Sequence, residues 1–123
     1  MIFGIGIDIV KTGRLQSAVE RWGDRFLKRV YTESEIAYAY GKSNPFLSLS
    51  ARFAAKEAMI KAIGRRTSVS LTDIEIVNTE EGIPSIRSAG ELKKFFEAHQ
   101  IQLAHVTLSH EAEYSVACVV LEK

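Results

Sequence analysis

The segment between Asn44 and Gly64 constrains the fold most, because its pattern predicts one long helix. Asn44 followed by Pro45 is a typical helix start, since proline is tolerated in the first turn, and Gly64 is a typical end. Apolar residues recur in it at the three- and four-residue spacings that give a helix one apolar face: Leu49, Phe53, Ile60 and Ile63. We expect that face to meet the core.

The same segment carries charges in an alanine-rich setting. Glu57 and Lys61 lie one turn apart on the flank of the apolar stripe, with little side-chain bulk around them. They either face a ligand or form an ordinary exposed ion pair worth roughly 0.2–0.5 kcal/mol. Lys56 falls inside the stripe, where a charge is costly to bury unless it is paired or its stem reaches outward. We interpret it as a sign of a second interface.

The N-terminal residues predict a strand with two unlike faces. From Ile2 to Val10 the side chains alternate: Phe3, Ile5, Ile7 and Ile9 on one face, and Gly4, Gly6 and Asp8 on the other. Glycine inside a strand often marks the close approach of a ligand or another backbone. We therefore expect space beside Asp8 for a metal or a phosphate. The alternative is that Asp8 caps or turns the strand end.

The rest of the chain predicts an α+β fold. Short helices are expected between residues 12 and 40, one of them opened by a capping box of Thr32 and Glu35. Strands are expected at about 73–79 and 84–88, a helix at about 89–99, and strands at about 102–110 and 113–121. The result is a single domain, residues 1–123, in which an antiparallel sheet packs with the long central helix and the shorter ones.

Composition narrows the class of protein. At 123 residues and 46% hydrophobic, the chain fits one compact domain. No apolar run approaches the roughly 20 residues of a spanning helix, and the N-terminal stretch contains Asp8 and lacks a basic leader. We expect a cytoplasmic protein without membrane insertion. Cys118, the only cysteine, lies in an apolar run and is expected to be inert and buried.

Basic side chains are concentrated in residues 11–30. This segment holds six basic against two acidic side chains, while the whole chain has a formal net charge of only +1. Such a patch favours an anionic partner, whether an acidic protein, phosphates or nucleic acid. The alternative is an ordinary solvated helix face.

Two carboxylates indicate a hard cation. Asp8 on the strand and Glu57 on the helix favour Mg²⁺, which usually takes one or two carboxylates and completes its shell with water and substrate phosphates. Lys61 would then neutralise a phosphoryl oxygen, and Arg52 would make a forked contact elsewhere on an anion. His110, at the predicted strand end, is either a polar ligand or proton acceptor, or a surface histidine. His105 points to the opposite face of that strand, so the two histidines do not share a zinc site.

These residues lie in segments whose order and spacing run nearly end to end. In them the chain resembles the bacterial holo-acyl-carrier-protein synthases: Gly4-Ile5-Gly6-Ile7-Asp8-Ile9-Val10, Arg25-Phe26-x-x-Arg29-Val30-Tyr31-Thr32-x-x-Glu35, Arg52-Phe53-Ala54-Ala55-Lys56-Glu57-Ala58 with Lys61 and Gly64, Asp73-Ile74-Glu75-Ile76, Gly82-x-Pro84, and Leu108-Ser109-His110. One departure is Arg65-Arg66-Thr67-Ser68, where many members carry a glycine-rich loop.

The resemblance implies a 4′-phosphopantetheinyl transferase of fatty acid biosynthesis. Asp8 and Glu57 would hold Mg²⁺ with the pyrophosphate of coenzyme A, and Lys61 would neutralise charge developing on it. A serine of apo acyl carrier protein would attack, releasing adenosine 3′,5′-bisphosphate. Further residues would line the coenzyme site: Arg52, Gly64 and His110. The base stays open between a metal-bound water, Glu57 and the corner formed by His110 and Glu111.

The resemblance also implies partners. Arg14, Arg21 and Arg25 would meet the acidic recognition helix of acyl carrier protein, with Phe26 as an apolar anchor. The family assembles as a homotrimer with active sites at subunit boundaries, so Lys56 would pair across an interface. The rival reading is a non-catalytic module that binds an acidic protein or nucleic acid through residues 11–30. It needs neither Asp8 nor Glu57, and the basic segment has few interleaved aromatic residues.

Overall fold

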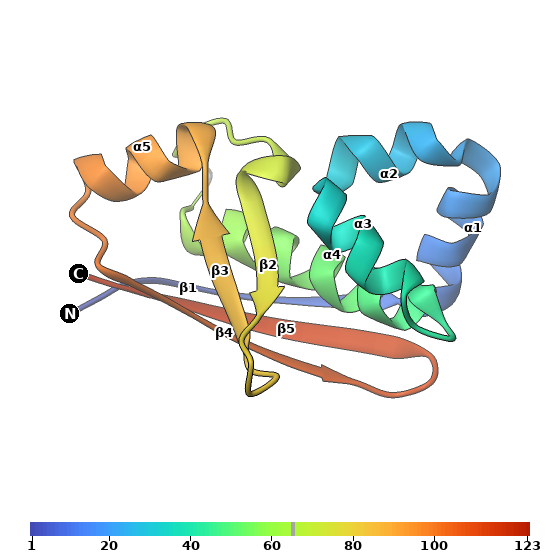
Figure 1. Ribbon diagram of the computed structural model, residues 1–123. Coiled ribbons are helices and arrows are strands. Elements are labelled where there is room, and N and C mark those ends of the chain that lie inside the picture. Colours follow the sequence, from blue (N-terminus) through green and yellow to red (C-terminus); the bar gives the residue numbers. More distant parts are fainter. Residues whose placement is uncertain (65) are drawn as a thin grey trace.

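The computed structural model describes residues 1–64 and 66–123, which form an α+β fold with five helices and two antiparallel sheets (Figure 1). In chain order the elements are β1 (Ile2–Lys11), α1 (Thr12–Trp22), α2 (Asp24–Val30), α3 (Glu33–Tyr40), α4 (Pro45–Ala62), a 3₁₀ turn (Leu71–Asp73), β2 (Ile74–Asn78), β3 (Pro84–Ser88), α5 (Gly90–Ala98), β4 (Leu103–His110) and β5 (Tyr114–Glu122). The predicted α+β class and the order of elements are confirmed.

The five strands divide into two sheets where a single sheet was expected. One sheet has the order β1-β5-β4, and β2 and β3 form a separate hairpin. Figure 1 shows the hairpin crossing the three long strands at a steep angle, so its edge does not run along β4. The expectation of one sheet was therefore wrong, although each predicted strand exists.

Both ends of α4 follow from the residues that mark them. The Asn44 side chain accepts a hydrogen bond from the Phe46 backbone nitrogen at 3.0 Å, and Pro45 occupies the first turn. Gly64 has a φ of +70°, in the left-handed region that stops a helix and favours glycine. The predicted start and end are confirmed.

The faces of α4 differ from the expectation. The helix contacts β1 and β5 on one side and α1 and α3 on another. Leu49 and Ile63 are buried as expected, but Phe53 and Ile60 are only partly buried, and small residues such as Ala54 and Ala58 fill the core instead. Because α4 lies between other elements, almost all of its faces are covered, and a single apolar stripe does not describe it.

The glycines of β1 serve a close backbone contact. A Cβ atom at Gly4 would overlap the carbonyl oxygen of Ala62, and one at Gly6 would overlap that of Ala58. The expectation that they clear space for a ligand was therefore wrong, because α4 fills that space. Their effect is to bring the helix against the strand that carries Asp8.

The isoleucine face of β1 belongs to the uncovered side of the three-stranded sheet. Ile5, Ile7 and Ile9 are 64%, 61% and 63% exposed, and Figure 1 draws no helix over this side. Cys118, paired with Ile7, is only partly buried there, so its expected burial was wrong. A register shift between Ile2 and Gly4 turns Phe3 out of this row to pack on the core. Among the described residues, no helix is long and apolar enough to cross a membrane.

Candidate active site

Asp8 and Glu57 line one hollow of about 340 Å³ between β1, α1 and α4. Its other walls are mainly apolar, including Leu15, Phe26 and Phe53, and Arg14 lies at its edge. The close packing of the β1 glycines on alanines of α4 brings the strand that carries Asp8 against the helix that carries Glu57. The structure thus brings together the two residues predicted to bind a metal.

Lys61 belongs to the same corner but bonds to the strand. Its Nζ donates to Asp8 Oδ1 at 3.1 Å and to the Ile7 carbonyl oxygen at 2.8 Å. The Lys61 and Asp8 side chains are 49% and 18% exposed, so both remain open to a ligand. This contact joins helix α4 to strand β1. The helix pattern had instead offered an i,i+4 pair of Lys61 with Glu57.

The donor set at this corner suits one kind of cation. Within residues 1–64 and 66–123, no cluster of three or more His, Cys, Asp or Glu side chains has the geometry to hold a metal. Zinc sites usually take three or four protein ligands and calcium sites six to eight oxygen ligands, more than two carboxylates supply. They do fit Mg²⁺, because Mg²⁺ accepts one or two carboxylates and leaves the remaining positions to water and phosphate.

Arg52 and His110 line a second hollow of about 430 Å³, away from Asp8. Lys42, Asn78 and Pro84 also line it. Within one chain, the structure therefore does not bring all of the predicted site residues together. It places Asp8, Glu57 and Lys61 in one group and Arg52 and His110 in another.

Arg52 is anchored tightly in this second hollow. Its guanidinium donates to Ser48 Oγ at 3.1 Å and to Asn78 Oδ1 at 3.0 Å, and it stacks 4.2 Å from the centre of the Tyr38 ring. Lys42 lies 4.8 Å from the same ring centre. Burial lowers the pKa of Arg52, and the Glu35 carboxylate opposes this. Arg52 Nε is buried with no hydrogen-bond partner within the described part of the chain.

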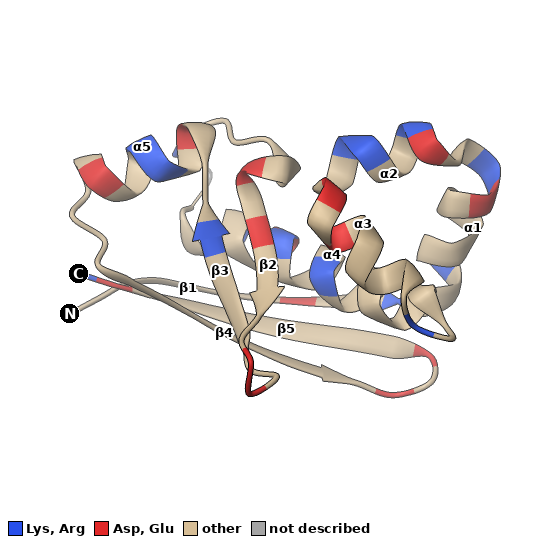
Figure 2. Ribbon diagram, in the orientation of Figure 1, with Lys and Arg blue, Asp and Glu red and all other residues tan. Residues whose placement is uncertain are grey.

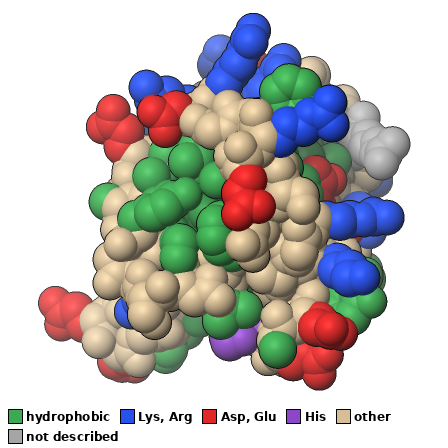
Figure 3. All heavy atoms as spheres, turned by 90° about the vertical axis from the view of Figure 1, so that its right-hand side faces the viewer, with side chains coloured by type: hydrophobic (Ala, Val, Ile, Leu, Met, Phe, Trp, Pro, Cys, Tyr) green, Lys and Arg blue, Asp and Glu red, His purple; other side chains and the backbone are tan. Residues whose placement is uncertain are grey.

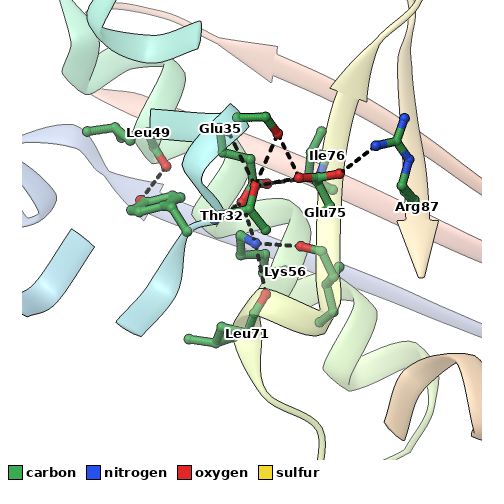
Figure 4. Close-up of polar contacts among 11 residues, drawn as sticks. Thr32, Glu35, Leu49, Lys56, Leu71, Glu75, Ile76 and Arg87 are labelled. Carbon is green, nitrogen blue, oxygen red and sulfur yellow. Dashed lines mark hydrogen bonds and ion pairs between the residues drawn. The ribbon is translucent and has the colours of Figure 1, made fainter. Parts of the chain in front are cut away.

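Lys56 is paired inside the chain, contrary to the expectation of an intersubunit pair. Its Nζ lies 2.8 Å from Glu35 Oε1, and both side chains are fully buried. Two carbonyl oxygens, of Leu71 and Ile74, also accept from this ammonium group (Figure 4). Burial lowers the pKa of Lys56, and the Glu35 charge opposes the shift. The Lys56 charge is thus satisfied without a second subunit.

The basic segment forms one end of the molecule. Figure 2 shows Lys and Arg positions spread along the ribbon of α1 and α2, and Figure 3 shows basic side chains gathered over the upper part of this end above hydrophobic patches. A groove there is lined by Trp22, Arg25, Phe26 and Arg29. Phe26 also lines the Asp8 hollow, so the two depressions share a wall.

Several lining residues were missed at the sequence level. Trp22 and Arg29 line the groove, Phe53 lines the Asp8 hollow, and Tyr38 and Lys42 line the Arg52 hollow. The Arg21 guanidinium lies 4.9 Å from the ring centre of Trp22, one of the few aromatic residues of the basic segment. Tyr38 carried no signal, because its role depends on α3 packing beside α4.

The end of α4 beyond Lys61 is only partly described. Gly64 is exposed, and a Cβ atom added there would lie in ordinary contact with the Arg66 side chain, 3.4 Å from its Nε. Arg66 lies 4.8 Å from the centre of the Phe3 ring. Arg65, the first residue of the departure Arg65-Arg66-Thr67-Ser68, lies outside the described residues.

Comparison with known proteins identifies the family. The model of the 4′-phosphopantetheinyl transferase superfamily matches residues 4–119. The holo-[acyl-carrier-protein] synthase of Thermodesulfovibrio yellowstonii is 41% identical over 121 residues, which are 98% of this chain and 99% of the relative. The chain belongs to the holo-[acyl-carrier-protein] synthase family.

Solved structures of family members share the fold. The holo-[acyl-carrier-protein] synthase of Neisseria meningitidis has a TM-score of 0.92 and 35% identity, with both chains covered completely. That of Helicobacter pylori, in complex with coenzyme A, has a TM-score of 0.83 and 33% identity, covering 96% of this chain and 99% of the relative. The resemblance drawn from the sequence segments is confirmed.

Proposed function

We propose that this chain, as one domain over residues 1–123, transfers 4′-phosphopantetheine from coenzyme A to a serine of apo acyl carrier protein. The serine oxygen would bond to the pantetheine-side phosphorus, and the bond from that phosphorus to the bridging oxygen would break. Holo acyl carrier protein and adenosine 3′,5′-bisphosphate would be the products. The main support is that Asp8, Glu57 and Lys61 lie together where β1 packs on α4, in a chain that belongs to this family.

Asp8 and Glu57 are the proposed Mg²⁺ ligands. The bound cation would neutralise the pyrophosphate and help to orient it for in-line displacement. Lys61, with its side chain half exposed, can turn its ammonium group from Asp8 towards a phosphoryl oxygen. The proton of the serine hydroxyl needs an acceptor, and of the two protein groups considered, Glu57 lines the Asp8 hollow whereas His110 lines the other.

The Arg52 hollow is the proposed site for the nucleotide end of coenzyme A. Arg52 and Lys42 supply positive charge for its phosphates, and both cations lie against the Tyr38 ring. His110 adds a polar group to the same hollow. The unpartnered Nε of Arg52 supports a ligand at this place. Gly64 would line the path of the coenzyme near Lys61.

A homotrimer would unite the two hollows. The exposed isoleucine face of β1 supports an interface there, because contiguous apolar surfaces of this kind mark contacts between proteins. Active sites at subunit boundaries would bring the Asp8 hollow of one copy to the Arg52 hollow of another. The chain would act in the cytoplasm, in fatty acid biosynthesis.

Residues of α1 and α2 are the proposed dock for acyl carrier protein. Arg14 borders the Asp8 hollow, Arg25 and Phe26 line the adjoining groove, and Arg21 is exposed beside Trp22. A bound acidic helix would thus lie next to the proposed metal site. Full-length similarity to synthases does not favour the alternative of a non-catalytic binding module.

A mass-shift assay tests the proposal. Purified protein, Mg²⁺, coenzyme A and an apo acyl carrier protein should yield a carrier heavier by one phosphopantetheine, and chelation should stop the gain. Asp8→Ala and Glu57→Ala should lose activity by roughly a hundredfold or more with the fold intact. Arg14→Glu should chiefly raise the KM for the carrier. Absence of any mass gain with several bacterial carriers would refute the assignment.

A further inference from the structure

The buried Glu35 carboxylate joins three elements, α3, α4 and β2. Its Oε1 accepts from the Thr32 backbone nitrogen at 2.9 Å, at the start of α3, and from Lys56 Nζ of α4 at 2.8 Å. Its Oε2 accepts from the Ile76 backbone nitrogen of β2 at 2.8 Å. We call Glu35, Lys56 and the backbone of Ile76 the buried brace (Figure 4). None of these groups touches either hollow.

A second set of contacts joins the same three elements beside the Arg52 hollow. Arg52 of α4 stacks on Tyr38 of α3 and donates to Asn78, the last residue of β2. We call Tyr38, Arg52 and Asn78 the Arg52 cluster. All three line the hollow proposed for the nucleotide end of coenzyme A.

The two sets are successive layers of one arrangement. Their offsets are three residues on α3 (Glu35 to Tyr38), four on α4 (Arg52 to Lys56) and two on β2 (Ile76 to Asn78). Spacings of three or four on a helix keep side chains on one face, and on β2 Asn78 lies two residues beyond the backbone nitrogen that Glu35 holds. The buried layer therefore fixes the relative placement of the elements whose next residues form the Arg52 cluster.

We propose that the Glu35–Lys56 pair is a positioning device for the coenzyme pocket, acting through Arg52. The pair holds α3, α4 and β2 in the arrangement that lets one guanidinium reach Tyr38 and Asn78 together. A buried ion pair is weak evidence of added stability, since hydrophobic replacements often do as well. Its use here is geometric, because a carboxylate accepts from three elements and an apolar side chain accepts from none. This inference rests on the proposed function of the Arg52 hollow.

The test uses an isosteric change at Glu35. In Glu35→Gln the side-chain amide presents a donor where the carboxylate had an acceptor, so at least one of the three N–H donors loses its partner. We expect the KM for coenzyme A to rise about tenfold, with kcat within about twofold of the parent, because the pocket is displaced while Asp8 is not. Direct binding of coenzyme A, followed by calorimetry, should weaken by the same factor.

A double-mutant cycle separates positioning from general destabilisation. If Glu35 acts through Arg52, Glu35→Gln should add little to the rise in KM already caused by Arg52→Gln. Glu91→Gln is the matched control, since it disrupts the exposed pair with Lys94 on α5 and should leave KM unchanged. Should Glu35→Gln fail to fold, Lys56→Gln, which keeps hydrogen-bonding capacity, takes its place in the same cycle.

The outcomes are distinct. An unchanged KM for coenzyme A in a folded Glu35→Gln variant, or additive effects with Arg52→Gln, would overturn the positioning role while leaving the transferase assignment intact. An inactive parent protein that binds no coenzyme A would instead overturn the proposed function itself.

Discussion

Two lysines of α4, five residues apart, pair with carboxylates in opposite settings. Lys56 and Glu35 are fully buried at 2.8 Å, whereas Lys61 and Asp8 are 3.1 Å apart with side chains 49% and 18% exposed. Lys56 is further bonded to the carbonyl oxygens of Leu71 and Ile74. The charge of the first pair is fully committed to the protein, and that of the second remains available to a ligand.

The contrast shows that burial, and not residue type, decides whether a lysine of this helix can reach a ligand. If one partner of a buried ion pair is removed, the other charge stays buried and unpaired, which is costly. In an exposed pair, water solvates the remaining charge. The same substitution at the two lysines should therefore have different consequences for folding and for activity.

Lys56→Met should have the largest effect on stability. It leaves Glu35 buried without its cation, so we expect the free energy of unfolding to fall by about 3–5 kcal/mol. Urea denaturation followed by circular dichroism measures this. Combining it with Glu35→Gln should recover part of the loss, because the uncompensated charge is gone. A loss below about 1 kcal/mol for the single variant would mean that this pair behaves like a surface pair.

Gly6→Ala should disturb the corner where Asp8 meets α4. The added Cβ would overlap the Ala58 carbonyl oxygen, so strand and helix must separate, at a cost of about 1–3 kcal/mol. Activity should fall further than stability predicts, since Asp8 moves away from Glu57. Gly13→Ala is the control: a Cβ there meets nothing within 4 Å, and alanine favours the α1 helix. If the two variants had the same stability and the same activity, the close packing of β1 on α4 would matter for neither.

Lys61→Met should change the free energy of unfolding by only about 0–1 kcal/mol, as expected for an exposed pair. Transfer activity should nevertheless fall, because a cation is lost beside the proposed pyrophosphate site. Thermal denaturation and the mass-shift assay, run on the same sample, separate the two readouts. If Lys61→Met lowered the free energy of unfolding as much as Lys56→Met does, the Lys61–Asp8 pair would be as important for stability as the buried pair.

Much of this organisation could be predicted from the sequence because it is local. The ends of α4, the capping box of Thr32 and Glu35, and the alternation of β1 depend on neighbouring residues, and the structure confirms each. The sequence also predicted that Asp8 and Glu57 lie near each other, since two carboxylates on a strand and a helix suggested a common cation, and both line one hollow.

The errors concern contacts between elements distant in sequence. The intersubunit partner expected for Lys56 followed from the homotrimer that the resemblance implies, and the true partner, Glu35, lies 21 positions earlier, where no local pattern reveals the contact. Gly4 and Gly6 were given to a ligand because the sequence does not distinguish a ligand from a backbone that approaches as closely. The contact of Tyr38 with Arg52 was missed for the same reason as that of Glu35 with Lys56. Neither ion pair of α4 was therefore predicted with its partner: Lys61 was expected beside Glu57 and bonds to Asp8, and Lys56 bonds to Glu35.

The smallest predicted effect is a pH dependence at the outer edge of the buried brace. Hydrogen bonds from Thr32 and then Ser34 hold the pKa of Glu75 below its ordinary value of 4.5. The folded state thus binds this proton less tightly than the unfolded state, so the stabilisation is present above pH 4.5 and is lost as the pH falls towards the lowered pKa. In Glu75→Gln, the deficit in unfolding free energy should be greatest near neutral pH and shrink below pH 4.5, as measured by urea denaturation at a series of pH values. A deficit that stays constant with pH would mean that the Glu75 carboxylate gains nothing from its charge, and that ionisation contributes to this network only at the sealed Glu35–Lys56 pair.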